Sequence, residues 1–441
     1  MAIEVISGKE AMKFLKENKN SRYPTPQINK ERLFPFPKPE SIPGFSINEN
    51  SKVFTMGSCF AREIDKVLVV NGFDVTSRSS TLSKVAERTG ADESLYNKYT
   101  IHSIVNELRW ALDPAHPYDP ERALVRISED NWTDPQLGGN VFASSYESMC
   151  KFRASYCDSI SRAKNADVII ITLGLVEAWY DKQSELYLNL PPHPRALTRF
   201  PNRFELRVLD YNEILSKLDE LHSIIERFCK PSVKILITVS PVPLEATFRN
   251  QDVLIANTYS KAVQRAAVEQ FIYQHDNIDY FPSFECVALG NPNHNWSGDY
   301  RHVNPHVVRL IMGTVMSKYT QAEDCQKNLI SSEIDFLYQK KQYSEIIRRF
   351  EINPPADLTL SATYRTGLSY KHLGKIKKAF VIFEHCLQLD ECYKPALQNA
   401  LSAAAKLGLL EKFNKLLADH EKHYPDDFEF RKVKQSQILS S

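Results

Sequence analysis

Apolar residues gather in three short runs in the first part of the chain, and each run stops at a glycine or a serine. The runs are Lys52 to Met56, Asp167 to Leu173 and Val233 to Val239, and a shorter one covers Ile278 to Phe281. The second and third runs are continuous and rich in β-branched residues, which is typical of strands covered on both faces. We therefore expect these segments to be strands of one buried sheet.

Stretches with the apolar spacing of helices follow or separate these runs. They cover Ala61 to Val70, Tyr211 to Cys229, about Asp252 to His275 and, after the last strand, Val307 to Lys318. Strands that alternate with helices predict an α/β domain with a mainly parallel, three-layer sheet over residues 51–325. Such folds bind ligands beyond the carboxyl ends of their strands, so chemistry is expected in the polar residues that follow each strand.

The first 50 residues have a different texture and are expected to form an N-terminal arm. A short helix is predicted from Gly8 to Lys19. The stretch from Pro24 to Pro43 is rich in proline, which excludes helix and central strand. Aromatic residues lie between the prolines, so we expect this segment to pack along a domain surface.

Residues 331–441 contain no good strand and show a loose internal repeat. Leu373-Gly374 recurs as Leu407-Gly408, 34 residues later, which is the period of the tetratricopeptide repeat. The spacing of five positions, Gly374 among them, is typical of a tetratricopeptide helix pair: Gly367, Tyr370, Gly374, Ala379 and Phe383. A generic helical bundle is the alternative. A repeat domain would form a small solenoid whose concave face binds a protein partner.

Composition narrows the class of protein. The chain has 441 residues, enough for two or three domains, and its net charge is +1, so the basic field that nucleic-acid binding requires is missing. The first residues lack the pattern of a secretory signal, and no apolar run approaches the ~20 residues of a membrane span. The eight cysteines include no CxxC, which favours reduced thiols in a cytoplasmic protein over a zinc site or a disulfide framework.

Ser58 follows the first predicted strand and is the candidate nucleophile. Gly57 before it permits a tight turn, and the next helix points its free N–H groups at an oxyanion near Ser58. A nucleophilic serine needs a base, usually a histidine oriented by a carboxylate. Asp299 and His302 supply this pair, because residues at i and i+3 share a face of a helical turn. Taken alone, His302 is better interpreted as an ordinary loop histidine.

The pair follows the last strand, where we expect the edge of the sheet to approach the first strand. Together with the Gly-Ser turn, it matches a known family. Gly57-Ser58-Cys59-Phe60-Ala61 spells the signature of the GSCFA family, which belongs to the SGNH/GDSL hydrolase-like group. Four further blocks resemble those of this family or group: Thr172 to Trp179, Val239 to Pro243, the DxxH of Asp299 and His302, and Tyr96-Asn97 with Thr100-Ile101. The likeness covers about residues 50 to 320.

The resemblance implies a flavodoxin-like fold, no cofactor and a triad in which Ser58 is the nucleophile, His302 the base and Asp299 its orienting group. In the wider group a Gly-x-Asn block supplies oxyanion donors, but the block that starts at Gly174 contains no asparagine. Gly174 still offers a backbone N–H, and the side chain of Asn97 is a candidate replacement.

Three further residues have two interpretations each. Glu177 is an oxyanion donor only if it is protonated, and a structural role at the strand end is the alternative. Trp179 either stacks on a sugar ring or packs in the core. Cys59 is expected to point away from the nucleophile into packing, and His294, His302 and His306 do not have the spacing of a metal site.

The resemblance favours a serine esterase that removes an O-acyl group, acetyl above all, from a carbohydrate or polysaccharide through an acyl-enzyme. An O-acyltransferase of polysaccharide biosynthesis would use the same triad and differ in its acceptor. The sequence has no clear coenzyme A signature, which favours the esterase. The third hypothesis is a non-catalytic carbohydrate-binding or scaffolding protein, motivated by the tail repeats and the missing asparagine.

Overall fold

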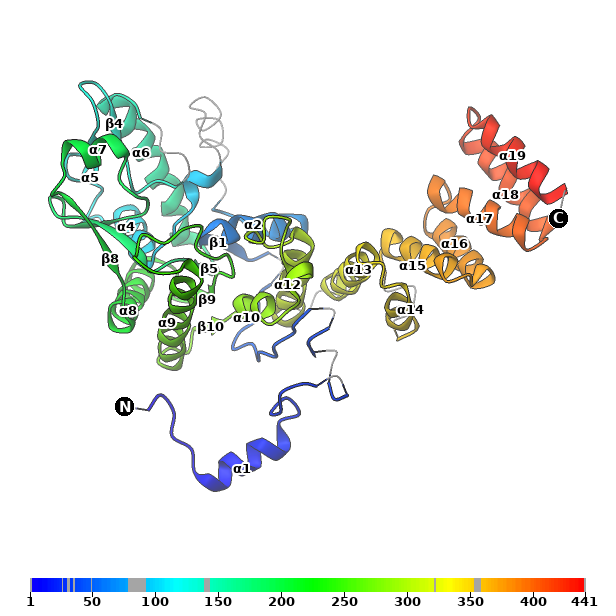
Figure 1. The fold of residues 1–441 in the computed structure, drawn as a ribbon, viewed down its shortest axis with the longest axis horizontal. Helices are drawn as coiled ribbons and strands as arrows, with labels where there is room; N and C mark the ends of the chain where they lie inside the picture. Colours follow the sequence, from blue (N-terminus) through cyan, green and yellow to red (C-terminus); the bar gives the residue numbers. More distant parts are fainter. Residues whose placement is uncertain are drawn as a thin grey trace. The chain divides into compact units, whose positions relative to one another are not determined.

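The computed structural model describes the chain apart from residues 1, 26, 30–31, 35, 49, 78–92, 139–142, 321–322, 353–357 and 440–441. The chain divides into two compact units, Met1–Gln321 and Ala322–Ser441 (Figure 1). Within the described residues, every helix is too short or too polar to cross a bilayer.

A parallel sheet of five strands forms the centre of the first unit, as the sequence pattern predicts. The strands are β1 (Lys52–Gly57), β2 (Asp74–Val75), β5 (Val168–Leu173), β9 (Lys234–Val239) and β10 (Ile278–Tyr280). Their order is β10-β9-β5-β1-β2. Counted along the chain, this is the 2-1-3-4-5 order of flavodoxin-like folds, whose ligands bind where the order reverses, between the first and third strands. In this protein that point lies between β1 and β5.

Helices cover both faces of the sheet, which gives three layers (Figure 1). One face carries α2 (Cys59–Val70), α10 (Ser283–Ala288) and α12 (Pro305–Tyr319), and the other carries α4 (Ile101–Leu112), α6 (Tyr146–Ser161), α8 (Tyr211–Phe228) and α9 (Val253–Tyr273). All six residues of β5 are buried, in agreement with its continuous apolar run. Phe54 and Met56 of β1 join the core under the second group of helices.

A second sheet, antiparallel and three-stranded, follows β5 and is absent from the predicted elements. It consists of β6 (Glu177–Asp181), β7 (Leu186–Leu188) and β8 (Phe204–Val208) in the order β7-β6-β8. The strands are short and their pattern is mixed with charged and turn residues, so the sequence carries only a weak strand signal there. The remaining short elements are β3 (Val125–Arg126), β4 (Trp132–Thr133), α5 (Pro120–Ala123), α7 (Pro194–Arg199), α11 (Pro292–Asn295), η2 (Glu93–Tyr96) and η3 (Arg162–Asn165).

The N-terminal arm begins with α1 (Gly8–Glu17), two residues shorter than predicted, and continues along the first unit. Phe36 is fully buried. The Gly44 N–H donates to Asp279 Oδ2 at 2.8 Å, and the Ile47 N–H donates to the Tyr319 carbonyl at 2.7 Å. The arm therefore packs beside β10 and the end of α12, as its mixture of prolines and aromatics predicts.

The second unit is all helical: α13 (Glu323–Gln339), α14 (Tyr343–Ile352), α15 (Leu360–His372), α16 (Ile376–Leu389), α17 (Lys394–Lys406), α18 (Leu410–His423) and α19 (Phe428–Leu439). One hydrogen bond recurs at three helix ends. It runs from Gln342 N to Leu337 O, from Lys375 N to Tyr370 O and from Leu409 N to Ala404 O, at 2.9, 2.9 and 3.0 Å.

The recurring Leu-Gly pair in the sequence thus marks a recurring turn between helices. Gly374 and Gly408 have φ values of 72° and 66°, the left-handed conformation that ends a helix most readily at glycine. The region is a helical repeat, and its assignment to the tetratricopeptide class stays a prediction.

Candidate functional site

Ser58 lies where β1 turns into α2, as predicted. Gly57 has a φ of 141°, and a Cβ at this position would stand 2.1 Å from the Thr172 carbonyl oxygen, so the turn requires glycine. Ser58 is the N-cap of α2, and its Oγ accepts a hydrogen bond from the Phe60 N–H at 3.4 Å. The same Oγ lies 3.3 Å from Thr172 Oγ1 on β5. The side chain is therefore held at the point where β1 and β5 diverge.

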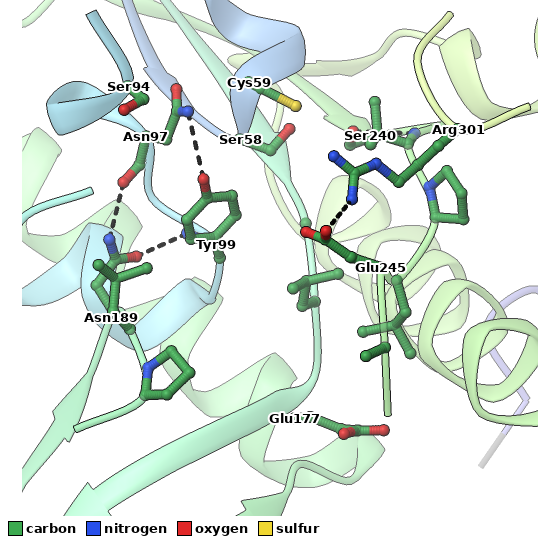
Figure 2. Close-up of a pocket in the computed structure, with 18 of the residues that line it drawn as sticks. Ser58, Cys59, Ser94, Asn97, Tyr99, Glu177, Asn189, Ser240, Glu245 and Arg301 are labelled. Carbon is green, nitrogen blue, oxygen red and sulfur yellow. Dashed lines mark hydrogen bonds and ion pairs between the residues drawn. The ribbon is translucent and has the colours of Figure 1, made fainter. Parts of the chain in front are cut away.

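A pocket of about 640 Å³ opens at this carboxyl edge of the sheet (Figure 2). It brings together six of the seven residues that the sequence singles out: Ser58, Asn97, Gly174, Glu177, Trp179 and His302. Asp299, the seventh, stands behind His302. Residues that are 244 positions apart, Ser58 and His302, thus share one cavity because the strands that precede them end at the same edge.

Asp299 and His302 form the expected pair. His302 Nδ1 lies 2.5 Å from Asp299 Oδ2, while Asp299 Oδ1 accepts the backbone N–H groups of His302 and Arg301 at 3.0 and 3.1 Å. These hydrogen bonds, the His302 side chain first, hold the Asp299 pKa well below its ordinary value. The carboxylate therefore stays ionised and fixes Nδ1, which leaves Nε2 directed elsewhere.

The local geometry of this pair differs from the prediction. It lies in a tight loop, not in a helical turn: Trp296 and Val303 form a bridge, and Tyr300 between them has a φ of 54°. The predicted approach of the sheet edge to β1 is also wrong, because β9 and β5 lie between β10 and β1. The loop that follows β10 instead reaches the pocket at the carboxyl edge of the sheet, where Arg301 and His302 line it.

Ser58 and His302 share the pocket without a direct bond. Among the described residues, Ser58 Oγ has hydrogen bonds with Thr172 and Phe60 and none with His302. The His302 side chain is half exposed, at 51%. Arg301 and Glu245 form an ion pair of 2.6 Å next to it, and Figure 2 shows this pair on the opposite side of Ser58 from Asn97. Catalytic hydrogen bonds are often open in the unliganded state and tighten with substrate.

Asn97 lies directly beside the turn that holds Ser58. It forms an isolated parallel bridge with Gly57, and the N–H of the next residue, Lys98, donates to the Gly57 carbonyl at 2.7 Å. Its Nδ2 donates to the Tyr99 hydroxyl over a long 3.3 Å, and Figure 2 shows the amide next to Ser58. An amide donor, which the block at Gly174 lacks, therefore lies in the same pocket as Ser58.

A buried ionic network that the sequence does not reveal fixes the Asn97 segment. Lys98 Nζ lies 2.8 Å from Glu107 Oε1, and Arg153 pairs with the same carboxylate and with Asp134. All four side chains are almost completely buried, and this burial lowers the Lys98 pKa and raises the Asp134 pKa. Nothing in the local pattern marks these charges, since their partners come from distant segments.

Gly174 directs its backbone N–H toward Ser58. The Leu173 carbonyl accepts the Ser240 N–H at 2.7 Å on the β9 side. In a planar trans peptide the N–H points opposite to the C=O, so the Gly174 N–H points to the β1 side. The Gly174 carbonyl in turn accepts Lys261 Nζ at 2.8 Å and Gln264 Nε2 at 3.1 Å.

Lys261 is a functional candidate that the sequence misses. It lies on the inner face of α9 and is fully buried, which lowers its pKa to about 7. The residues around it in α9 form an ordinary helical pattern, so only the packing of this helix against the Gly174 turn identifies it.

Glu177 and Trp179 anchor the loop that follows β9. Glu177 Oε1 accepts the Thr247 hydroxyl at 2.6 Å, and Oε2 accepts the Phe248 N–H at 2.9 Å. The Trp179 ring packs edge-on against Phe248, with 5.3 Å between ring centroids. Both oxygens of Glu177 thus act as acceptors, an arrangement that suits a structural carboxylate.

Thiol and metal chemistry have little support at this pocket. Burial raises the Cys59 pKa, so the thiol next to Ser58 stays protonated. Across the described residues, the groups placed closely enough to hold a metal ion are Glu391, Cys392 and His423, which lie in the helical unit.

The first unit is therefore a three-layer α/β protein with a serine at the switch point of its sheet and an Asp-His pair on the same pocket. The sequence profile of the GSCFA family matches residues 52–314, which is more than half of the chain, and the protein belongs to this family. The GSCFA family is loosely related to the SGNH hydrolases. No curated protein and no solved structure matches the chain.

Proposed function

We propose that this protein is a serine esterase that cleaves O-acyl esters at the pocket of Ser58. Ser58 Oγ attacks the ester carbonyl, His302 takes its proton and Asp299 holds the imidazole. The alcohol leaves with a proton from His302, and water then releases the acyl group from Ser58. The observation that carries this proposal is the single pocket shared by Ser58 and the His302 of an Asp-His pair.

Two donors are available for the oxyanion of the tetrahedral intermediate. The first is the Gly174 N–H, which points to the β1 side of its turn. The second is Asn97 Nδ2 beside the Gly57–Ser58 turn, whose one long hydrogen bond, to the Tyr99 hydroxyl, an oxyanion could replace. The Ser58 N–H already donates to the Thr172 carbonyl at 3.2 Å, and Glu177 accepts at both oxygens, so neither contributes. Each donor is worth on the order of 10²–10³ in rate.

The reaction requires one rearrangement. The Ser58 hydroxyl has to leave Thr172 Oγ1 and turn toward His302 on the other side of the pocket. Staggered rotamers of a serine interconvert easily, and a bound ester supplies the contact that favours the new one. A non-catalytic binding protein has no need of this movement.

The substrate expected from the family resemblance is an acetylated carbohydrate or polysaccharide. Transfer to a sugar hydroxyl in place of water would use the same residues, and the half-exposed His302 leaves room for either acceptor.

An activity-based fluorophosphonate probe tests the nucleophile. We expect the wild-type protein to be labelled at Ser58 and the Ser58→Ala variant to be inert. Ser145→Ala is the matched control, because Ser145 is likewise the N-cap of a helix, α6, and its loss costs a similar ~1 kcal/mol of stability. An unlabelled wild type, or equal labelling of Ser58→Ala, would exclude the esterase and favour the binding protein.

A further inference from the structure

The exposed surface of the pocket is mainly apolar, and aliphatic side chains contribute much of it. Leu188 and Leu190 come from the end of β7, Val242 and Pro243 follow β9, and Leu175 follows Gly174. The cavity of about 640 Å³ has the size of pockets that enclose drug-sized ligands. An acetyl group, with three non-hydrogen atoms, would fill a small part of it.

Several polar side chains of this region are engaged in hydrogen bonds within the protein. Asn189 Oδ1 accepts the Tyr99 N–H at 2.8 Å, and Asn189 Nδ2 donates to the Asn97 carbonyl at 2.9 Å. Glu177 is bonded to Thr247 and Phe248, while Trp179 Nε1 and Asn97 Oδ1 are buried without a hydrogen-bond partner among the described residues. The many hydroxyls of a sugar ring placed here would find few partners for the water that they lose, whereas an alkyl chain needs none.

The position of this lining assigns it to the acyl side of the ester. Leu188 and Leu190 flank Asn189, which Figure 2 shows across the pocket from Arg301 and Glu245. The opposite side carries His302, Arg301 and Glu245, which are charged or polar and partly exposed. Histidine protonates the departing alcohol, so the alcohol leaves on this polar side.

An exposed aromatic side chain lines the pocket. Phe248 is 55% exposed. The loop that carries Phe248 is tied to α9 by a 3.1 Å hydrogen bond from the Leu244 N–H to Asn257 Oδ1. Exposed apolar side chains beside a pocket are typical of a binding site for an apolar ligand.

We propose that the acyl group cleaved at Ser58 is an aliphatic chain well longer than acetyl, bound between Leu175, Leu190 and Val242. This inference rests on the proposed esterase function and leaves a polar alcohol, such as a sugar, on the His302 side. The chemistry is ordinary ester hydrolysis: the acyl C–O bond to the alcohol breaks, water supplies the new C–O bond, and a fatty acid and the alcohol are released.

A chain-length series on the full chain tests the proposal. The substrates are the p-nitrophenyl esters of acetic, butyric, octanoic and dodecanoic acid. Each newly buried methylene improves kcat/KM by up to about fourfold, so we expect octanoate to exceed acetate by at least about tenfold. A flat series, or one in which acetate is best, overturns the inference. So does faster cleavage of octyl acetate than of methyl octanoate, because the chain would then lie on the alcohol side.

Two variants connect the preference to this pocket. Val242→Trp fills the pocket and is expected to bring the octanoate-to-acetate ratio of kcat/KM close to one. Val70→Trp is the matched control, since Val70 is 85% exposed at the far end of α2, and it should keep the wild-type ratio. An unchanged ratio in a folded Val242→Trp protein contradicts the proposal.

Failure of the inference and failure of the esterase function can be told apart. Turnover that depends on Ser58 but favours acetate removes only the chain-length proposal. If no ester is cleaved and the fluorophosphonate probe does not label Ser58, both the esterase function and the chain-length proposal are excluded. Calorimetry of sodium octanoate and sodium acetate with Ser58→Ala adds a readout without turnover: octanoate should bind at least tenfold more tightly, and equal affinities count against the proposal.

Discussion

At the scale of single residues, the site depends on the glycine turn before Ser58 and on the short contact between Asp299 and His302. Gly57 occupies a backbone region that residues with a side chain rarely adopt, and it lets Ser58 approach Thr172. Asp299 has two hydrogen bonds with His302 and accepts a third from the Arg301 N–H of the same loop. Both arrangements are local in sequence, which explains why five consecutive letters and a DxxH are enough to find them.

The turn at Gly57 can be tested through stability. In Gly57→Ala the new methyl group meets the Thr172 carbonyl and the φ of 141° is strained, so we expect a loss of about 2–4 kcal/mol in the free energy of unfolding. Gly298→Ala has open space around its Cβ and should change the free energy by less than about 1 kcal/mol. Urea unfolding followed by circular dichroism measures both. Similar values for the two variants would mean that the turn at Gly57 is relaxed.

The role of Asp299 is tested by Asp299→Asn. We expect kcat on the best ester to fall on the order of 10²–10⁴-fold with little change in KM, because the amide no longer orients His302 for proton transfer. Asp276→Asn, an exposed carboxylate on the turn after α9, serves as control and should keep full activity. Since the Asp299 pKa is lowered in the folded protein, the wild-type carboxylate stays ionised down to pH values below about 4. A variant as active as wild type would contradict the triad.

At the scale of elements, the supports of the site come from helices and strands far from it in sequence. Helix α9 inserts Lys261 and Gln264 under the Gly174 turn, and the β6-β7-β8 sheet supplies one wall of the pocket. An ammonium group buried in this way is costly unless it loses its proton. The helix therefore makes the stability of the unit dependent on pH.

Lys261→Met is expected to remove that dependence. The Lys261 pKa is about 7 in the folded protein and about 10.4 in an unfolded chain, so between these values the unfolded state binds more protons. Stability from this residue therefore rises with pH from about 7 to 10, by up to ~1.4 kcal/mol per pH unit, and is flat below 7. Urea unfolding at pH 6.5, 8 and 9.5 should show this rise in the wild type and lose it in Lys261→Met.

The control for this experiment is Lys182→Met, which removes an exposed lysine from the same unit. Its pH profile should follow the wild type. If Lys261→Met also follows the wild type, Lys261 keeps its proton in the folded protein, and the proposed origin of the slope is wrong.

At the scale of the whole molecule, the pocket belongs to the first unit alone. Its lining runs from Ser58 to His302, and the helical repeat begins after residue 322. The first unit has its own continuous core around β5, so it is expected to fold without the repeat. The protein partner predicted from the repeat in the sequence is then expected to bind the second unit.

A chain that ends at Thr320 tests whether the first unit is active without the helical repeat. We expect its kcat/KM on a small ester to stay within about twofold of the full chain, while a pull-down that depends on the repeat unit is lost. Ser58→Ala in the shortened chain is the negative control. A shortened chain that is folded but inactive would place part of the catalytic machinery in the repeat unit.

The sequence predicted the elements with strong local signals and missed those without them. β5 and β9 were found because both faces of these strands are buried, which gives continuous apolar runs. β6, β7 and β8 were missed because these strands are short and mix apolar with charged residues, as loops do. Among site residues, Ser58 and His302 have recognisable neighbours, whereas Lys98 and Lys261 look like ordinary helix or loop lysines until their buried partners are known.

The sequence by itself determined the strand-turn-helix at Ser58, the Asp299–His302 contact and the alternation that produces a parallel sheet. Each depends on residues a few positions apart or on a period along the chain. Only the tertiary structure decided that Ser58, Asn97, Gly174 and His302 open on one pocket, and that aliphatic walls surround it. The reason is that parallel strands align their carboxyl ends at one edge whatever their distance in sequence. Packing between distant segments decides which side chains meet at this edge, and a local sequence pattern does not contain that information.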